Sequence, residues 1–477
     1  MTHPIAPEKT REPFAGDQNA GLSSARENSA SSATTKDSFF GHPRGLAYLA
    51  FTEAWERFSF SGMQSLLVLY MVHQLLQPGS IEHVYGFENF RWAVEFVYGP
   101  LAPQPLSSVV FGLYTSLVFF MPVFGGILGD RKFGQHSMVM AGAIFMAIGH
   151  FMMAFEASFL LALLMLILGS GCLKGNITTQ VGSLYSDTDR RRGDGFQIFQ
   201  AGLNAGILLA PLICGTLGEV YGWHYGFGAA GVGMLIGLVI YIAGKRHLPP
   251  DRLLSEPVDR APLMPQDGRL VLLLLLVFVA VTSFLTGAGQ LGNVYNLWLK
   301  DYADRSMFGL TIPVTWFHIL TPLLSLLFMP PLVKTWQEMY KRGTEPSLLA
   351  KMGIGLGLTT LAMLSLATLA YFAQTTGKVR WEWVMVMHVL LTMGYLFVYP
   401  VGLALFSSAA PRGTRATFIA IFFMSSFLAS NIVGWLGRYY STMSPAEFWL
   451  MHAAIPGCGA LLVMLLARPL GKAALPS

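Results

Sequence analysis

Charged residues are scarce in this sequence. Only 12% of its 477 residues are Asp, Glu, Lys or Arg, whereas 53% are hydrophobic and the mean hydropathy is +0.52. Soluble domains carry about 25% charged residues, so the composition excludes an ordinary soluble protein. The net charge of +5 does not indicate nucleic-acid binding, because membrane proteins gather Lys and Arg in their cytosolic loops.

Cysteine and enzyme motifs are also rare or missing. Cys172, Cys214 and Cys458 each lie inside an apolar segment without metal-ligand spacing, so we expect neither a disulfide nor a metal site. The sequence contains no HExxH or GxSxG pattern, which argues against a membrane enzyme. A Gly-x-Gly-x-x-Gly pattern at 287–292 lies in an apolar segment with no strand before it, so it predicts helix packing and no cofactor.

Twelve apolar segments dominate the sequence, and each is long enough to cross about 30 Å of hydrocarbon as a helix. They lie at 45–77, 107–128, 136–157, 159–183, 195–218, 224–244, 270–297, 312–337, 347–372, 381–408, 415–440 and 445–467. A Pro-rich, charged linker at 245–269 separates the first six from the last six. The pattern predicts an all-α membrane protein with two six-helix bundles, 44–244 and 270–468, and no extra helical pair between them.

The hydrophilic segments predict the orientation of the chain. Residues 1–43 are rich in Ser and charged residues, which predicts a disordered cytosolic tail. Residues 469–477 are predicted to form a second, short cytosolic tail. Lys and Arg concentrate in the loops on the same side as these tails, which places both termini in the cytosol of an inner-membrane protein. The aromatic outer connection at 78–106 could form a short amphipathic helix along the membrane surface.

Four charges lie inside the apolar segments of the first half. Glu53, Glu56 and Arg57 are spaced i, i+3, i+4 and therefore share one helical face, and Lys174 lies at a similar depth in the fourth segment. Each would cost roughly 2.5 to 3.5 kcal/mol at the bilayer centre if unpaired. A static ionic lock is one interpretation. We favour the other, in which a carboxylate carries a proton when its cationic partner leaves.

Several motifs resemble those of the proton-dependent oligopeptide transporter (POT/PTR) family of the major facilitator superfamily. They are EAWERFSFSG, FGGILGDRKFG, GCLKGN, the long RRGDGFQIFQAGLNAGILLAPLICGTLGEVYGWHYGFG stretch, IPVTWFHILTPLL, KRGTEPS and YPVGLAL. The resemblance implies proton-driven peptide uptake through a site between the two halves. It assigns proton coupling to Glu53, Glu56, Arg57 and Lys174. It also makes Asn204 a peptide-backbone contact, with helix packing as the alternative.

The sequence departs from the family at several pocket positions. Phe60 and Ser61 stand where the family has two tyrosines, and Phe119 aligns with a third. Gln64 and Gly289 replace both partners of one salt bridge, so the outer gate must close by other contacts. The candidate substrate contacts are Arg57, Lys174, Asn204, Phe60, Ser61, Gln64, Phe119, Gln290, Thr321, Tyr395 and Phe422; the candidate gating residues are Asp130 and Arg131.

The most consequential departure is Tyr395, where the family has a glutamate that meets the amino terminus of the peptide. A phenol cannot neutralise an ammonium group, and Thr321 and Phe422 likewise replace an asparagine and a tryptophan. We therefore expect a monomeric proton symporter for modified, capped or cyclic peptides. Other interpretations remain open: a carrier of organic acids, nitrate-like anions or drugs, including an exporter, or a transport-dead sensor. His318 and His388 could assist coupling, although packing roles are favoured.

Overall fold

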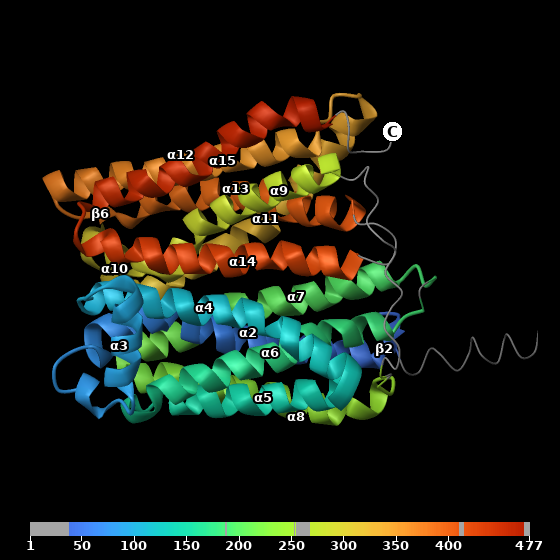
Figure 1. Ribbon diagram of the computed structural model, residues 1–477, viewed down its shortest axis with the longest axis horizontal. Coiled ribbons are helices and arrows are strands. Elements are labelled where there is room, and N and C mark those ends of the chain that lie inside the picture. The colour runs from blue at the N-terminus through green and yellow to red at the C-terminus, as the bar shows by residue number, and fades with distance from the viewer. Residues whose placement is uncertain (1–37, 187, 252, 254–267, 410–414, 472–477) are drawn as a thin grey trace, which may run out of the picture.

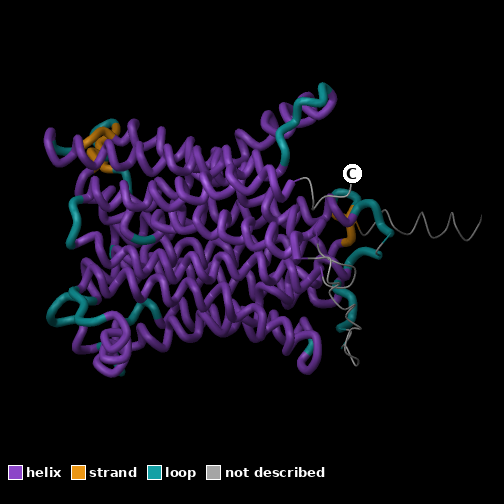
Figure 2. Tube along the Cα trace, turned by 45° about the horizontal axis from the view of Figure 1, so that its top comes forward, coloured by secondary structure: helices purple, strands orange, loops and turns teal. Residues whose placement is uncertain are grey.

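The structure is a computed structural model that describes residues 38–186, 188–251, 253, 268–409 and 415–471. Most of the predicted N-terminal tail lies outside the described residues. Its last six residues form a small antiparallel hairpin, in which β1 (Ser38–Phe39) pairs with β2 (His42–Pro43). Nearly all the rest of the described chain is helical (Figure 2).

Six long helices form the first half. They are α2 (Arg44–Tyr70), α4 (Pro103–Leu128), α5 (Gln135–Met152), α6 (Phe159–Ser183), α7 (Arg192–Ala210) and α8 (Trp223–Gly244). Short π-helical turns extend three of them: η1 (Met71–Leu75), η3 (Gly129–Phe133), η5 (Pro211–Gly215) and η6 (Leu217–Tyr221). Single 3-10 turns occur at η2 (Ile81–His83), η4 (Glu156–Ser158) and η7 (Lys245–His247).

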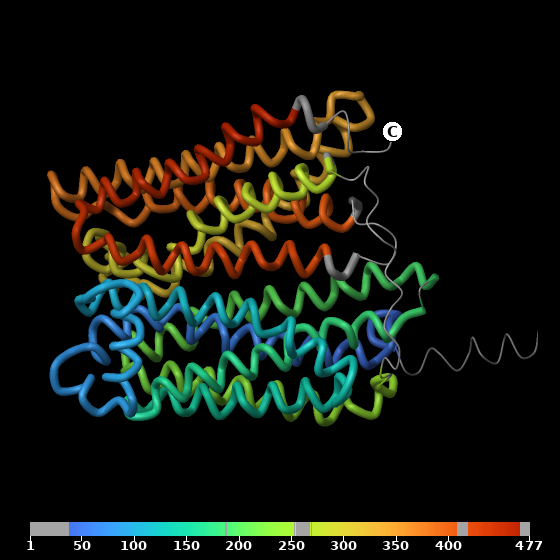
Figure 3. Tube along the Cα trace, viewed as in Figure 1, coloured from blue at the N-terminus to red at the C-terminus, as the bar shows by residue number. Residues whose placement is uncertain are grey.

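The second half repeats this arrangement. Its long helices are α9 (Gly268–Gly289), α11 (Leu320–Lys341), α12 (Leu348–Thr376), α13 (Trp381–Ala409), α14 (Arg415–Gly437) and α15 (Pro445–Gly471). Shorter helices are η9 (Gln290–Gly292), α10 (Val294–Tyr302), η10 (Val314–Ile319) and η11 (Arg438–Ser441). The two halves lie side by side, blue to green and yellow to red along the chain (Figures 1 and 3).

The helices account for the twelve predicted spans. Ten are long and apolar enough to cross a membrane by length and composition alone. The other two are α2, which carries four charged side chains, and α5, which has 18 residues. Both pack inside the first half, α2 against α7 and α8, and α5 against α6. Residues 245–267 between α8 and α9 are too few for an extra pair of spans.

The predicted seventh span is broken rather than continuous. It runs as α9, the short turn η9 and then α10, with the backbone of Asn293 at φ −107° and ψ −112° outside the helical region. The glycine pattern at 287–292 lies at this break. A side chain at Gly289 would meet Val433, and one at Gly292 would meet Phe111, so these glycines serve close helix packing as predicted.

The long helices run between two ends of the molecule, named here the linker end and the far end (Figure 1). The linker end carries residues 245–251, and the far end carries the short strands β3 (Ala303–Asp304) and β6 (Val379–Arg380), which pair in parallel (Figure 1). A small hairpin pairs β4 (Ser306–Met307) with β5 (Leu310–Thr311). The predicted amphipathic helix of the 78–106 connection is α3 (Phe87–Tyr98), also at the far end. Its Val94 is buried, whereas Trp92 and Phe96 are exposed.

Near the far end the halves meet backbone to backbone. A β-carbon added at Gly112 of α4 would lie 2.6 Å from the Cα of Gly434 and 2.8 Å from the carbonyl oxygen of Ser430, both on α14. Only glycine permits this approach. The contact lets α4 and α14 pack closely along the boundary between the two bundles.

We predict that Gly112→Val destabilises the protein by about 1 to 3 kcal/mol, the usual cost of overpacking. The matched control is Gly126→Val on the same helix, because a β-carbon there meets nothing within 4 Å. Thermal unfolding of the purified protein measures both variants. Equal shifts in the two unfolding midpoints would contradict a close helix contact at Gly112.

Candidate functional site

An arginine between two buried glutamates forms the centre of the site on α2. Arg57 Nε donates a hydrogen bond of 2.8 Å to Glu53 Oε1 and lies 2.9 Å from Glu56 Oε2. Both carboxylates are buried, at 3% and 0% exposure. Glu53, Glu56 and Arg57 therefore meet on one face of α2, and one guanidinium pairs with two carboxylates.

Lys174 of α6 lies beside this group but pairs with neither glutamate. Its Nζ is 4.0 Å from the ring centroid of Phe60 and 5.7 Å from that of Phe119. Within the described part of the chain, no hydrogen-bond acceptor reaches this Nζ. It is close enough to Glu56 for direct electrostatic attraction. The ammonium is therefore held mainly by the faces of two aromatic rings.

Phe60 contacts both cations of the site. Its ring centroid lies 5.8 Å from Arg57 Cζ, on the same ring that the Lys174 ammonium approaches. A phenylalanine offers only its π face to a cation, whereas the tyrosine of the resembled family would also offer a hydroxyl. Phe60 therefore contacts the Lys174 ammonium without accepting a hydrogen bond from it.

Glycines bring the neighbouring helices close enough to enclose these charges. A β-carbon at Gly206 of α7 would lie 2.0 Å from the carbonyl oxygen of Ala54 and 3.0 Å from Arg57 Cβ. One at Gly125 of α4 would lie 1.9 Å from the carbonyl oxygen of Gly171, three residues before Lys174. Side chains at these two positions would push α7 and α6 away from their partners.

The other candidate contacts of the first half are only partly enclosed. Ser61, Gln64, Phe119 and Asn204 are each half-buried. They lie on α2, α4 and α7, the helices that surround the arginine and the lysine. Their proposed contact with a substrate stays a prediction.

In the second half, the candidate contacts divide into two groups. Tyr395 and Thr321 are half-buried. The ring of Tyr395 stacks on that of Tyr399, with 5.6 Å between the ring centroids. No described residue forms a hydrogen bond with Thr321 Oγ1. Phe422 is fully buried and packs its ring against Tyr399. The amide of Gln290 is also fully buried and donates to the carbonyl oxygen of Val433.

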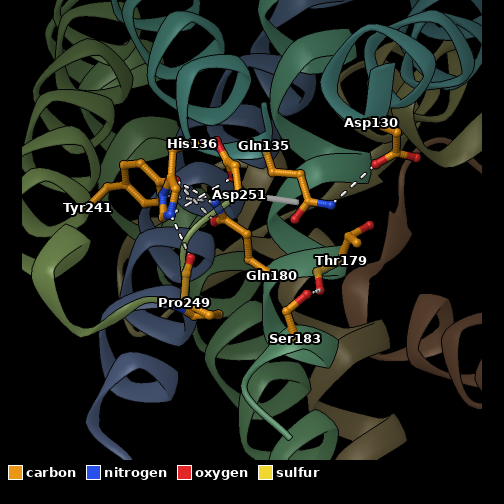
Figure 4. A network of polar contacts seen from close by, with 9 residues as sticks. All are labelled: Asp130, Gln135, His136, Thr179, Gln180, Ser183, Tyr241, Pro249 and Asp251. Carbon is orange, nitrogen blue, oxygen red and sulfur yellow. Dashed lines mark hydrogen bonds and ion pairs between the residues drawn. The ribbon is translucent and has the colours of Figure 1, made fainter. Parts of the chain in front are cut away.

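The candidate gating residues lie at the linker end. Asp130 accepts a hydrogen bond of 3.2 Å from Gln135 (Figure 4). Arg131 is exposed. Next to them lies a polar network that the sequence did not indicate. The ring of His136 reaches the hydroxyl of Tyr241 at 3.2 Å and the carbonyl oxygen of Pro249 at 3.0 Å. This network fastens the first part of the linker to the first half.

Hydrogen bonds across the far end join the two halves. Ser108 Oγ donates to Asn293 Oδ1 at 3.0 Å, and Asn296 Nδ2 donates to the carbonyl oxygen of Ser65 at 3.2 Å. His318 Nε2 is 2.8 Å from Asn296 Oδ1. The bonds of Ser108 and Asn296 therefore join the halves at this end, where the sequence has Gln64 and Gly289 in place of a salt bridge.

His388 lies in the same region of the second half. Its Nε2 is 2.8 Å from the hydroxyl of Tyr295, and the ring is fully buried. His318 and His388 therefore each form a hydrogen bond with a neighbouring side chain, an arrangement that fits a packing role.

Twelve spans in two bundles, with buried charges on α2 and α6 of the first bundle, are typical of a secondary transporter of the major facilitator kind. A family model described as "POT family" matches residues 136–261 and 263–450, more than half of the chain. The chain belongs to the POT family. It is accordingly a multi-pass membrane transporter and not an enzyme.

Relatives across several bacteria support this assignment. A peptide transporter of Yersinia enterocolitica is 28% identical over 90% of this chain and 94% of its own length. A di-/tripeptide transporter of Lactococcus lactis is 27% identical over 92% and 98%. A crystal structure of a variant of the peptide transporter POT in complex with alafosfalin has a TM-score of 0.80 at 26% identity, covering 92% of this chain and 97% of that one. The match confirms the predicted fold.

We predict that Phe60→Leu destabilises the protein by about 0.5 to 2 kcal/mol beyond the loss of packing, because the Lys174 ammonium loses its nearest aromatic face. Phe60→Tyr should keep most of the stability. Phe119→Leu is the matched control, since that ring lies 5.7 Å rather than 4.0 Å from Nζ. Thermal unfolding would speak against the cation–π contact if Phe119→Leu cost as much as Phe60→Leu.

Proposed function

We propose that this protein is a proton-coupled symporter that imports carboxylate-bearing, peptide-like solutes. The observation that carries the proposal is Lys174: a buried ammonium without a hydrogen-bond acceptor among the described residues, next to an arginine held by two glutamates. A buried cation of this kind is expensive unless a counter-charge reaches it. The carboxylate of a solute would supply that charge.

The coupling follows from the shared arginine. While both glutamates are ionised, Arg57 is held between them. Protonation of Glu53 or Glu56 removes one of these charges, so Arg57 or Lys174 becomes free to bind the solute carboxylate. Release of the solute and the proton on the other side restores the ion pairs. Proton and solute therefore depend on the same set of charges.

The second half favours a solute without a free amine. Tyr395, Tyr399 and Thr321 supply aromatic rings and hydroxyls, and none of them can neutralise an ammonium group. We therefore propose capped, cyclic or otherwise modified peptides as the preferred substrates. An organic acid has the same carboxylate and also lacks the amine, and it is the second candidate for this pocket.

The orientation belongs to the same proposal. Basic residues gather in the loops of the linker end, so this end would face the cytosol together with both termini. The far end would face the outside of the inner membrane. One chain carries both halves of the site, which makes the monomer the proposed transporting unit.

We predict that N-acetyl-dialanine binds at least roughly tenfold more tightly than dialanine, a difference of about 1.4 kcal/mol. The free amine of dialanine would be buried without a counter-charge, whereas the capped form keeps the carboxylate alone. Competition in proteoliposomes against a panel of free, capped and cyclic peptides and simple organic acids measures this. Robust pH-dependent uptake of dialanine, at an affinity equal to that of the capped form, would refute the substrate proposal.

We predict that Glu56→Gln abolishes accumulation driven by a pH gradient but preserves solute exchange, because the amide can neither release nor bind the coupled proton. The matched control is Glu338→Gln, which removes an exposed carboxylate paired with Lys341 on the surface. Gradient-driven uptake and counterflow in proteoliposomes separate the two activities. Unchanged accumulation by the Glu56→Gln variant is incompatible with the proposed role.

A further inference from the structure

An arginine at the far end reaches from the second half of the chain to the first. Arg438 begins η11, directly after the last residue of α14. Its Nη1 donates a hydrogen bond of 3.1 Å to the carbonyl oxygen of Tyr98, the last residue of α3. Its Nη2 donates one of 2.6 Å to the hydroxyl of Tyr439. The bond to Tyr98 joins two segments that lie 340 positions apart in the sequence.

The bond to Tyr98 caps the C-terminal end of α3. The last carbonyl groups of a helix have no partner within it, and the helix dipole favours a cation near them. Gly99, which ends α3 at φ 78°, directs its own N–H to the carbonyl oxygen of Glu95, one turn earlier. Arg438 therefore supplies, from the other half, a donor and a positive charge that stabilise the end of α3.

Aromatic rings from both halves enclose the guanidinium of Arg438. Its Cζ lies 4.7 Å from the ring centroid of Tyr439, 5.4 Å from that of Trp435 and 6.0 Å from that of Tyr98. Its Nε is buried and has no hydrogen-bond acceptor among the described residues. Guanidinium groups stack on aromatic faces and are weakly hydrated, which suits them to such a position. Tyr98 thus provides two contacts, its ring and its carbonyl, and both are lost if the halves separate.

Contacts within the first half fix the position of Tyr98. Arg91 Nε donates to Glu95 Oε1 at 2.9 Å, and Nη2 of the same arginine donates to the carbonyl oxygen of Leu101 at 3.0 Å. The N–H of Leu101 donates to Glu95 Oε1, also at 3.0 Å. These bonds hold the turn after α3, and the buried Val94 anchors the helix itself. The carbonyl of Tyr98 therefore keeps its place in the first half when the second half moves.

A second bond crosses the boundary beside Arg438. Gln104, in the first turn of α4, donates from Nε2 to the carbonyl oxygen of Gly437 at 3.1 Å and to Ser108 Oγ at 3.0 Å. A β-carbon at Gly437 would lie 2.9 Å from Ser108 Oγ, so α4 and the end of α14 are in close contact. Because Gly437 and Arg438 are neighbours in the chain, separation of the halves here would break the bonds of Gln104 and Arg438 together.

We propose that Arg438 is a gating residue, whose contacts with Tyr98 hold α3 of the first half against η11 of the second and keep the far end closed. A transporter of this fold opens its two ends in turn, so a contact made only in the closed state favours that state by its own free energy. Arginine stays charged in proteins, so the contact does not respond to protons. It acts on the opening itself, whichever solute is carried and in either direction.

The experiment measures both ends of the molecule at neutral pH, with no solute and no gradient. Spin labels at Tyr85→Cys and Leu310→Cys, exposed positions on opposite halves, report the far end by electron–electron distance measurement. A second pair, Gly193→Cys and Tyr340→Cys, reports the linker end. Tyr340 is exposed, and a β-carbon at Gly193 meets nothing within 4 Å. The background carries Cys172→Ala, Cys214→Ala and Cys458→Ala.

Arg438→Gln removes the charge and the guanidinium that lies between the rings. We expect the open-to-closed ratio at the far end to rise at least roughly fivefold, while the linker end becomes correspondingly more closed. Opposite changes at the two ends identify a shifted equilibrium, since a merely loosened structure would broaden the distances at both. Arg438→Lys keeps a cation that can donate to the Tyr98 carbonyl, so it should reverse part of the change.

Two further variants make the test specific. Arg380→Gln removes an exposed cation of the far end whose partner, Glu382, lies in the same half, so it should leave both distances unchanged. Tyr98→Leu removes the ring from the first half but keeps the backbone carbonyl. The far end should therefore open more than in the unmodified protein and less than in Arg438→Gln. Tyr98→Leu also serves as the test if Arg438→Gln does not fold.

Four outcomes would contradict a gating role for Arg438. They are an unmodified protein that is already open at the far end, an Arg438→Gln variant with the unmodified distances, an Arg380→Gln variant that opens as much, and distances that broaden at both ends together. Each leaves the substrate and coupling proposals untouched, because no solute is present. Conversely, failure of the uptake experiments would not change the distances measured here.

Discussion

The cost of charge in an apolar surrounding governs this structure. Glu53, Glu56, Arg57 and Lys174 lie where an unpaired charge costs several kcal/mol, and the helices around them are brought together by glycines so that the charges can meet. Three of the four charges form direct ion pairs, in which one guanidinium contacts two carboxylates. The fourth, Lys174, lies against aromatic rings, and no hydrogen-bond acceptor among the described residues reaches its Nζ.

The sequence alone predicted the features that depend on local pattern. Apolar length located the twelve spans, and the i, i+3, i+4 spacing placed Glu53, Glu56 and Arg57 on one face. It could not show that Arg57 takes both carboxylates while Lys174 takes neither. That choice depends on side-chain positions on separate helices, and no periodicity within one segment records it.

Contacts between the halves were beyond prediction for the same reason. Arg438 appears in the sequence as one basic residue near the end of an apolar segment, and its partner Tyr98 lies 340 positions earlier. Gly99 and Pro100 indicate where α3 ends, but they do not indicate the donor that caps it. The network of His136 and Tyr241 at the linker end likewise needs three separate helices and the linker to be placed first.

The break in the seventh span has a mechanical consequence. Because α9 and α10 are separate rods joined by η9 and Asn293, the far portion need not tilt with the near one. Such interruptions act as hinges in membrane helices. Asn296 ties the outer rod to the first bundle through Ser65. The seventh span can therefore bend at η9 and Asn293, so that α10 changes its angle to α9 while the rest of the second bundle keeps its packing.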